Sequence, residues 1–480
     1  MTGLRPALDE LAEHDETLLA AYVENRPADP APALRRQTRA AQVHPVFFGS
    51  AITGAGVAEL IGGITTLLPP PDPPVDGPAA GTVFKVDRGP AGEKLAYVRM
   101  FAGALHVREQ VGADKVTGIA VFAGGGTESR PRVGAGQIAL VRGLAGIRIG
   151  DPVGAPPAGT REHFASPSLE TMVQPARPAD KGALHAALAE QAEQDPLINL
   201  RQDDTVSLYG EVQKQVIEAT LAERYGLAVT FRPTTTICIE RPVGSGAADE
   251  LIGVDPNPFL AQVGLRVTPG APGSEITFGL AVELGSMPYA FFKAVEETVP
   301  RTLEQGLYGW RVADVAVTMT HSGYYARQSH AHGTFDKSMS STAGDFRNLT
   351  PLVLMAALRR AGTRVHEPIH ALRLEIPADT LAAVLPELGR LRGVPLATTT
   401  RGPLCVVDGE IPAARVHDLQ QRLPALTRGE GVLESGFDRY APVSGPPPVR
   451  ERTDNNPLDR KEYLLRLNSR LTVALPSTVR

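Results

Sequence analysis

Cysteine is nearly absent from this 480-residue chain, which contains only Cys238 and Cys405. Both lie in apolar, strand-like runs, so the sequence excludes a disulfide-stapled scaffold and a cysteine-based zinc site as organising features. No apolar run approaches the roughly 18 residues that a membrane-spanning helix needs, and the N-terminus lacks the charged-then-apolar pattern of a signal peptide. We therefore expect a cytoplasmic protein.

An excess of one charge is also missing, because 48 basic residues stand against 53 acidic ones and the net charge is −5. This balance argues against a protein that coats nucleic acid non-specifically, although it allows a local basic surface. A hydrophobic content of 42% with 21% charged residues is typical of globular proteins. The length is too great for one core and predicts about three to five domains.

The motifs of a nucleotide-hydrolysing enzyme are absent as well. The chain contains no Gly-x-x-x-x-Gly-Lys-Ser/Thr phosphate loop and no Asn-Lys-x-Asp motif to read guanine. No Ser-His-Asp, Cys-His or paired-carboxylate arrangement stands out either. We assign no catalytic residue to this chain.

One nucleotide motif is nevertheless present in residues 44–64, "HPVFFGSAITGAGVAELIGGI". A buried strand at 46–48, a glycine loop and an apolar-periodic helix are predicted here, after a single helix over residues 8–22. The Gly-Ser-Ala sequence resembles the last nucleotide-contact motif of P-loop GTPases, in which the backbone after the serine touches guanine. The resemblance implies a nucleotide-binding remnant at Ser50, Ala51 and Ile52.

Residues 1–68 are therefore expected to be the C-terminal remnant of a GTPase domain, in a chain that begins after the catalytic half of that domain. GTP and magnesium are cofactors of such a family. Because the phosphate loop, switch and guanine-reading motifs are missing, we do not expect this chain alone to bind GTP and magnesium or to hydrolyse GTP.

The next segments are separated by changes in composition. A proline-rich linker at residues 69–80 marks a domain boundary, and short strands with glycine-rich turns predict a β barrel over residues 81–156. Residues 163–242 follow the order strand, helix, strand, strand, helix, strand, with strands at 197–202 and 206–210. This is the order of a ferredoxin-like sandwich.

The last third of the chain repeats that order in residues 368–443. Leu372, Leu374 and Ile376 alternate on one strand, and a helix with Val384 and Leu388 at helical spacing follows. This pattern predicts a second ferredoxin-like sandwich.

A separate α/β domain is expected between the sandwiches, at residues 243–367, with a final helix at about 345–361. A tail over residues 444–480 contains a predicted helix. We expect leucines of this helix, Leu464 among them, to pack on the last sandwich.

This succession of domains resembles elongation factor G and its relatives, and local motifs support the resemblance over nearly the whole chain. The motifs are Gly81-Thr-Val-Phe-Lys-Val86, Leu95-Ala-Tyr-Val-Arg99, Leu208-Tyr-Gly-Glu-Val212, Glu367-Pro368 and Leu426-Thr-Arg-Gly-Glu-Gly431. The resemblance implies a multidomain α+β fold with a GTPase-domain remnant, a β barrel, two ferredoxin-like sandwiches and an intervening fourth domain.

Within that family, the middle domain is similar to the tetracycline-resistance ribosomal protection proteins, especially the type found in oxytetracycline producers. The similar stretches are Thr318-Met-Thr-His321-Ser-Gly-Tyr324, Ser329-His-Ala-His332-Gly, Lys337-Ser-Met-Ser-Ser-Thr-Ala-Gly-Asp-Phe-Arg347 and the tail motif Asn456-Pro-Leu-Asp-Arg-Lys-Glu-Tyr-Leu-Leu-Arg466. Such proteins bind the 70S ribosome, reach small-subunit rRNA near the decoding centre and displace tetracycline.

The resemblance also implies the residues that would do this. The tip loop comprises Lys337, Ser338, Met339, Ser340, Ser341 and Thr342, with His321, Tyr324, His330 and His332 in support. Ser341 or Thr342 is expected to cap the following helix. Arg466 and Arg470 in the tail are candidates for RNA contact. We expect a monomer that makes no membrane contact.

Other interpretations of the same residues stay open at this point. The tip segment has the composition of an ordinary solvated loop, and His330 and His332 have the spacing of two metal ligands, although we assign no metal site. The whole chain is alternatively a ribosome-binding module without GTPase activity, or a fragment of a general translocation factor.

Overall fold

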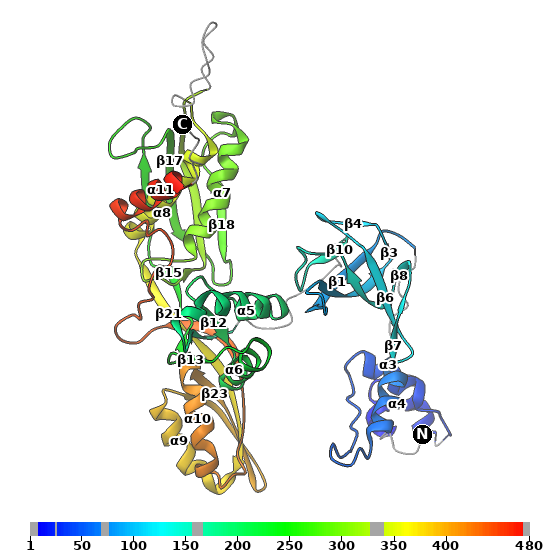
Figure 1. Cartoon of the computed structure of the whole chain (residues 1–480). Coiled ribbons are helices and arrows are strands. Elements are labelled where there is room, and N and C mark those ends of the chain that lie inside the picture. The colour runs from blue at the N-terminus through cyan, green and yellow to red at the C-terminus, as the bar shows by residue number, and fades with distance from the viewer. Residues whose placement is uncertain (1–7, 25, 69–75, 156–166, 327–339, 474–480) are drawn as a thin grey trace. The chain divides into compact units, whose positions relative to one another are not determined.

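The computed structural model of the chain describes residues 8–24, 26–68, 76–155, 167–326 and 340–473, and the side chains of the last helix as far as Leu467 (Figure 1). The chain divides into two compact units, Met1–Arg161 and Glu162–Arg480. Each unit is described separately below.

The first unit begins with four helices: α1 (Leu8–Ala12), α2 (Glu16–Val23), α3 (Ala31–Arg39) and α4 (Val57–Leu67). The prediction of a single helix over residues 8–22 is wrong. Asp15 interrupts it, because its backbone is extended and its carboxylate accepts hydrogen bonds from the N–H groups of Thr17 and Leu18. Asp15 is therefore the N-cap of a new helix.

The predicted buried strand at residues 46–48 is also wrong. This stretch has no strand assignment, and Val46 and Phe48 are 69% and 90% exposed. A strand needs a neighbour to complete its backbone hydrogen bonds, and the described part of residues 8–68 offers none. Phe47 instead lies against Gly63 of α4, where an added Cβ would come within 2.1 Å of its ring.

The rest of the first unit is a β domain around one core. Its strands are β1 (Ala80–Arg88), β2 (Lys94–Ala102), β3 (Ala104–His106), β4 (Gln110–Val111), β5 (Asp114–Lys115), β6 (Gly118–Ala123), β7 (Gly126–Ser129), β8 (Arg132–Gly134), β9 (Ile138–Arg142) and β10 (Pro152–Gly154). The main sheet has the order β10-β1-β2-β9-β6-β7. Alternate residues such as Val83, Val98 and Val141 are fully buried in the core.

Hydrogen bonds do not close this domain into the expected barrel. The end strands β10 and β7 make no pair with each other in the described part of the unit. All four residues of β7, Gly126–Ser129, are exposed, so this strand contributes no apolar side chain that could extend the core and close the sheet. The result is an open six-stranded sheet with two small strand pairs, β3-β8 and β4-β5.

The second unit starts with a small sandwich. It comprises β11 (Leu169–Pro175), α5 (Lys181–Gln194), β12 (Thr205–Leu208), α6 (Glu211–Tyr225), β13 (Val229–Phe231) and β14 (Thr235–Thr236). The predicted strand at residues 197–202 is absent. Asp195 accepts a hydrogen bond from the N–H of Leu197 and starts a short 3₁₀ turn, and Asn199 adopts a left-handed conformation that an extended strand does not allow.

A body with its own core follows, built from β16 (Gly246–Glu250), β17 (Ala261–Pro269), β18 (Ile276–Leu280), α7 (Tyr289–Leu303), β20 (Val315–Tyr324) and α8 (Ala343–Ala361). We call it the middle body. The sheet order is β16-β17-β20-β18, in which β18 and β20 are parallel. Apolar residues of the sheet and of both helices form one core, so the helices cover one face of the sheet.

The last sandwich is formed by β21 (Thr363–Pro377), α9 (Leu381–Arg390), β22 (Val394–Arg401), β23 (Leu404–Pro412), α10 (Ala413–Leu426) and β24 (Val432–Pro442). Its predicted apolar residues are confirmed as core, with Leu374, Ile376, Val384 and Leu388 fully buried. The first residues of β21 also pair with β15 (Ile239–Pro242), which pairs in parallel with β19 (Arg311–Val312). The sheet of the last sandwich therefore continues into β15 and β19, which we call the neck of the middle body.

The tail ends in α11 (Arg460–Val473), as predicted, but two of its described side chains contact the middle body rather than the expected last sandwich. The buried Tyr463 side chain donates to the carbonyl of Asn348 in α8, and Arg460 pairs with Glu250 at the end of β16. Both partners belong to the middle body. Among the helices that the structure describes, none is both long and apolar enough to cross a membrane.

Candidate functional site

One end of the middle body collects exposed apolar side chains. At this end β16 stops at Glu250, β17 and β20 meet where Ala261 pairs with Tyr324, and the two helices begin at Tyr289 and Ala343. The large apolar side chains exposed here, which we call the tip surface, are Leu251, Val254, Leu284, Tyr289, Tyr324 and Tyr325.

The tip surface is a local concentration of exposed apolar side chains. Leu284 and Tyr289 are both 70% exposed, whereas elsewhere in the described part of residues 243–367 only Val243 and Leu280 are large, apolar and exposed. A group of exposed apolar side chains of this kind usually marks a place where another molecule binds.

Aromatic packing fixes the tip surface on the core below it. The ring of Tyr324 meets Phe291 edge-to-face at 5.8 Å between centroids, and Phe291 stacks on the fully buried Phe346 at 4.7 Å. The backbone of Tyr325 donates to the hydroxyl of Ser341 at 2.7 Å, and the N–H of Ser341 donates back to the carbonyl of Tyr325. The two chain segments are thus joined at the base of the tip.

The predicted tip-loop residues are divided by the structure. Ser340 is buried and Ser341 makes the pair with Tyr325. Thr342 caps α8 in a capping box, because its side chain accepts from the N–H of Asp345 and its own N–H donates to the carboxylate of Asp345 at 2.8 Å. The expected cap is therefore confirmed at Thr342. Lys337, Ser338, Met339, His330 and His332 lie outside the described residues.

His321, the other predicted supporting residue, lies on β20 beside β17. A β-bulge opposite Gly264 and Leu265 adds one residue to β20 at this point. An added Cβ at Gly264 would lie 2.6 Å from the imidazole, so glycine leaves the space that the ring uses. The imidazole Nδ1 lies 3.1 Å from the hydroxyl of Thr320.

Charges of both signs lie around the tip surface. Asp249, Asp255 and Glu283 are exposed there, and Lys293 and Arg347 lie 3.8 and 3.6 Å from the carboxylate of Glu297. Apolar and aromatic rings can contact the faces of unpaired bases. Among the described residues, no group of three His, Cys, Asp or Glu is placed to hold a metal ion.

The predicted nucleotide remnant forms a closed turn. The N–H of Ser50 donates to the carbonyl of Ala55 at 2.9 Å, and Gly56 has a φ of 79° where a Cβ would come within 2.2 Å of the carbonyl of Phe48. Ala51 and Ile52 are exposed, Ile52 fully so. Their backbone can present N–H groups to a base edge. The chain contains no phosphate-loop motif.

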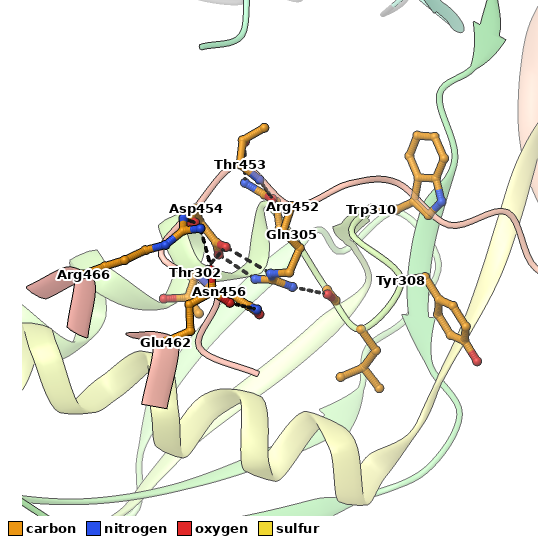
Figure 2. A network of polar contacts seen from close by, with 12 residues as sticks. Thr302, Gln305, Tyr308, Trp310, Arg452, Thr453, Asp454, Asn456, Glu462 and Arg466 are labelled. Atoms are coloured by element: carbon orange, nitrogen blue, oxygen red, sulfur yellow. Dashed lines mark hydrogen bonds and ion pairs between the residues drawn. The ribbon is translucent and has the colours of Figure 1, made fainter. Parts of the chain in front are cut away.

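A polar network in the tail is the feature that the sequence did not reveal (Figure 2). Thr453 exchanges two hydrogen bonds with Gln305, from its N–H at 2.8 Å and to its hydroxyl at 3.1 Å. Arg452 donates to the carbonyl of Gly306 and forms a two-point ion pair with Asp454. The partners Thr453 and Gln305, and Arg452 and Gly306, lie about 150 residues apart in the chain, so no local motif signals them.

Arg466, predicted to contact RNA, belongs to this network. Its guanidinium donates to the carbonyl of Asp454 at 2.9 Å and pairs with Glu462 at 2.5 Å, and Glu462 accepts from Asn456. The side chain of Arg470 lies outside the described ones. The role of Arg466 in RNA contact stays a prediction, and the structure gives it a role in holding the tail.

A buried carboxylate fastens the neck of the middle body. Glu240 on β15 has no exposed surface and accepts hydrogen bonds from the N–H groups of Leu307, Tyr308 and Trp310 and from the hydroxyl of Thr363. Burial raises its pKa, and these donors oppose that rise. The tail also contacts residues 307–310, because the N–H of Arg450 donates to the carbonyl of Tyr308.

Two family models match the second unit. One, described as Elongation factor G, domain IV, covers residues 240–362, and the other, described as Elongation factor G C-terminus, covers residues 364–450. Among solved structures, a protein from Thermus thermophilus matches 96% of this chain and 69% of its own, with 23% identity and a TM-score of 0.45. The tip surface lies within the domain IV match.

The curated relatives are resistance proteins. The chain is 44% identical to the oxytetracycline resistance protein of Streptomyces rimosus, over 96% of this chain and 72% of the relative. It is 41% identical to the tetracycline resistance protein TetM of Streptomyces lividans, over 89% and 68%. It is 32% identical to TetP of Clostridium perfringens, over 96% and 71%. With its multidomain α+β fold, the chain therefore belongs to the tetracycline-resistance ribosomal protection proteins, which are related to elongation factor G.

Proposed function

We propose that this chain binds the 70S ribosome and protects it from tetracycline, with the tip surface of the middle body directed at small-subunit rRNA of the decoding site. Displacement of the drug is then the outcome of that contact. Work on the ribosome implies a cytoplasmic protein, and we expect it to act as a monomer.

The tip surface is the observation that carries this proposal. Three tyrosines and three aliphatic side chains are exposed at one end of the middle body, on a core that stacks Phe291 on Phe346. Unpaired RNA bases stack on aromatic side chains, and each such contact contributes about 1–3 kcal/mol.

Co-sedimentation of the purified chain with 70S ribosomes tests the proposal, with and without tetracycline and a non-hydrolysable GTP analogue. We expect binding that competes with tetracycline. A variant with Tyr289→Ser and Tyr325→Ser should bind at least about 10-fold more weakly, because two stacking contacts are lost. Tyr22→Ser is the matched control, since Tyr22 is 57% exposed but lies in the first unit.

Two results would overturn the proposal. One is the absence of sedimentation with ribosomes under every condition. The other is equal binding by the tip variant and the wild type, which would place the contact elsewhere on the chain.

A further inference from the structure

We propose that Arg460, the first residue of α11, is a positioning residue for the tip surface. It fastens the loop formed by residues 251–256, which carries Leu251 and Val254 of that surface. The importance of this loop for binding rests on the proposed function, whereas its fastening by the tail is a property of the chain alone.

The contacts of Arg460 reach both ends of the loop. Its guanidinium makes a two-point ion pair with Glu250, with N–O distances of 2.6 and 2.9 Å, and also donates to the carbonyl of Pro256. Glu250 is the last residue of β16, directly before Leu251. One side chain from about 200 residues further along the chain thus holds the beginning and the end of the loop.

Loop 251–256 is also held by hydrogen bonds of Asn257, in addition to those of Arg460. The amide of Asn257 donates to the carbonyls of Leu251 at 3.0 Å and Ala261 at 2.8 Å, and its oxygen accepts from the N–H of Phe259. These bonds fix the base of the loop. Val254, which is 53% exposed, lies near the middle of loop 251–256. Arg460 adds contacts with Glu250 and Pro256 at the two ends of this loop.

The contacts of the tail before and after Arg460 set the position of this residue. The reciprocal bonds of Thr453 and Gln305 hold the tail on the end of α7, and Arg359 of α8 donates to the carbonyl of Leu458. Asp459 then caps α11, with its carboxylate accepting from the N–H of Glu462. The helix is held one turn later by Tyr463, only 4% exposed, whose hydroxyl donates to Asn348.

The Arg460–Glu250 ion pair is partly shielded from water, so the shape of the guanidinium affects how well it holds the loop. The side chain of Arg460 is 30% exposed and that of Glu250 is 16% exposed. A planar guanidinium can serve a carboxylate and a carbonyl at once, whereas a lysine ammonium is a single point of charge on a flexible stem. Arg460→Lys should therefore keep the charge but lose part of the fastening.

Hydrogen exchange of the purified 480-residue chain tests the fastening without a ribosome. In Arg460→Gln and Glu250→Gln, the amides of Asn257 and Phe259, which donate hydrogen bonds at the base of the loop, should exchange about 10-fold faster, as expected for the loss of a charge-assisted hydrogen bond. Arg460→Lys should give an intermediate rate. Exchange in the last sandwich should not change, which separates loss of fastening from general unfolding.

Lys461→Gln is the matched control, because Lys461 is the exposed neighbour of Arg460 and forms no ion pair with a described residue. It removes the same charge from the same helix and should leave the exchange rates as in the wild type. Unchanged exchange of the Asn257 and Phe259 amides in Arg460→Gln, or equally faster exchange in Lys461→Gln, would overturn the positioning role.

Ribosome binding then tests the consequence. Arg460→Gln should weaken 70S binding several-fold, and the charge exchange Glu250→Arg with Arg460→Glu should restore part of it. Failure of the wild type to bind would overturn the proposed function but not the fastening seen by exchange. Normal binding by Arg460→Gln, with the double tyrosine variant impaired, would remove loop 251–256 from the binding surface and overturn its functional part.

Discussion

Two helices of this chain carry the same apolar pattern in different surroundings. The pattern residues are Val57, Leu60, Ile61 and Ile64 in α4, and Leu381, Val384, Leu385 and Leu388 in α9. In α4 all four are between 42% and 57% exposed, whereas in α9 Val384 and Leu388 are fully buried against the sheet of the last sandwich.

The difference shows what helical periodicity does and does not determine. The spacing decides which face of a helix is apolar, because residues three and four apart lie above one another. It carries no information about a partner. The sheet strands β21 and β23 supply that partner to α9, and the described part of residues 8–68 contains no sheet that could supply one to α4.

Truncation of one leucine in each helix should give the largest difference between the two regions. Leu388→Ala should lower the free energy of unfolding of the second unit by about 3 kcal/mol, because it removes buried apolar atoms and leaves a cavity. Leu60→Ala should cost less than about 1 kcal/mol, since Leu60 is 42% exposed. Guanidinium unfolding followed by circular dichroism measures both.

The only tryptophan makes the assignment to a unit possible, because Trp310 is buried in the second unit. Leu388→Ala should shift the unfolding transition seen by its fluorescence, and Leu60→Ala should not. Similar losses for the two leucines would mean that α4 has a partner in solution and that the contrast between the helices does not exist.

The fold was predictable wherever a pattern had one interpretation. Alternation over Leu372, Leu374 and Ile376 identified β21 because those side chains share one buried face. Strand β22 was missed because all eight of its residues, from Val394 to Arg401, are exposed, and a strand with no buried face shows no alternation. The strand expected at residues 46–48 was wrong for the opposite reason, since its apolar side chains have no sheet to join.

The site was predictable only where its residues are close in the sequence. The Thr342–Asp345 cap follows a local spacing that capping boxes share. Leu284 lies in a 3₁₀ turn, Tyr289 begins α7 and Tyr324 ends β20, so their common surface depends on the fold. The contacts of Arg450, Arg452 and Arg460 join residues more than 100 positions apart, which single-sequence patterns do not reveal.

Buried and exposed ion pairs should also differ in how much they stabilise the protein, although by less than the two leucines do. Glu170 of β11 and Arg450 form a pair with side chains only 7% and 15% exposed, and the guanidinium lies 4.9 Å from the ring centroid of Trp310. Burial is the largest influence on the pKa of Glu170 and raises it. Glu170→Ala should cost about 2 kcal/mol, because it leaves the Arg450 charge shielded from water without its partner.

The matched exposed pair is Glu410 with Arg439, whose side chains are 22% and 50% exposed. Glu410→Ala should cost less than about 1 kcal/mol, and that loss should diminish in about 1 M salt. The same guanidinium titrations measure both variants. A loss for Glu410→Ala equal to that for Glu170→Ala would show that burial does not decide the contribution of a pair in this protein.

A fall in pH should give the smallest difference in stability between the first and second units, because His370 in the second unit and Asp15 in the first titrate in different pH ranges. Burial lowers the pKa of His370 below its ordinary value of 6.5, and its Nε2 lies 3.0 Å from the hydroxyl of Ser168. Because the folded state disfavours protonation, His370 contributes stability above pH 6.5 that is lost as the pH falls through its lowered pKa. The carboxyls of Glu170 and Glu240 act in the opposite sense, so the comparison needs a His370→Asn variant at each pH.

In the first unit the corresponding group is Asp15, whose pKa is lowered mainly by the N–H of Leu18. A depressed carboxyl contributes stability above its ordinary value of 3.8, and this is lost only as the pH falls further. Between about pH 6.5 and 5, the midpoint seen by Trp310 fluorescence should therefore fall more in the wild type than in His370→Asn, while exchange protection of α2 stays constant. A parallel loss in both regions over that range would mean that they unfold together, and that the exposed helices are coupled to the second unit more strongly than their surroundings indicate.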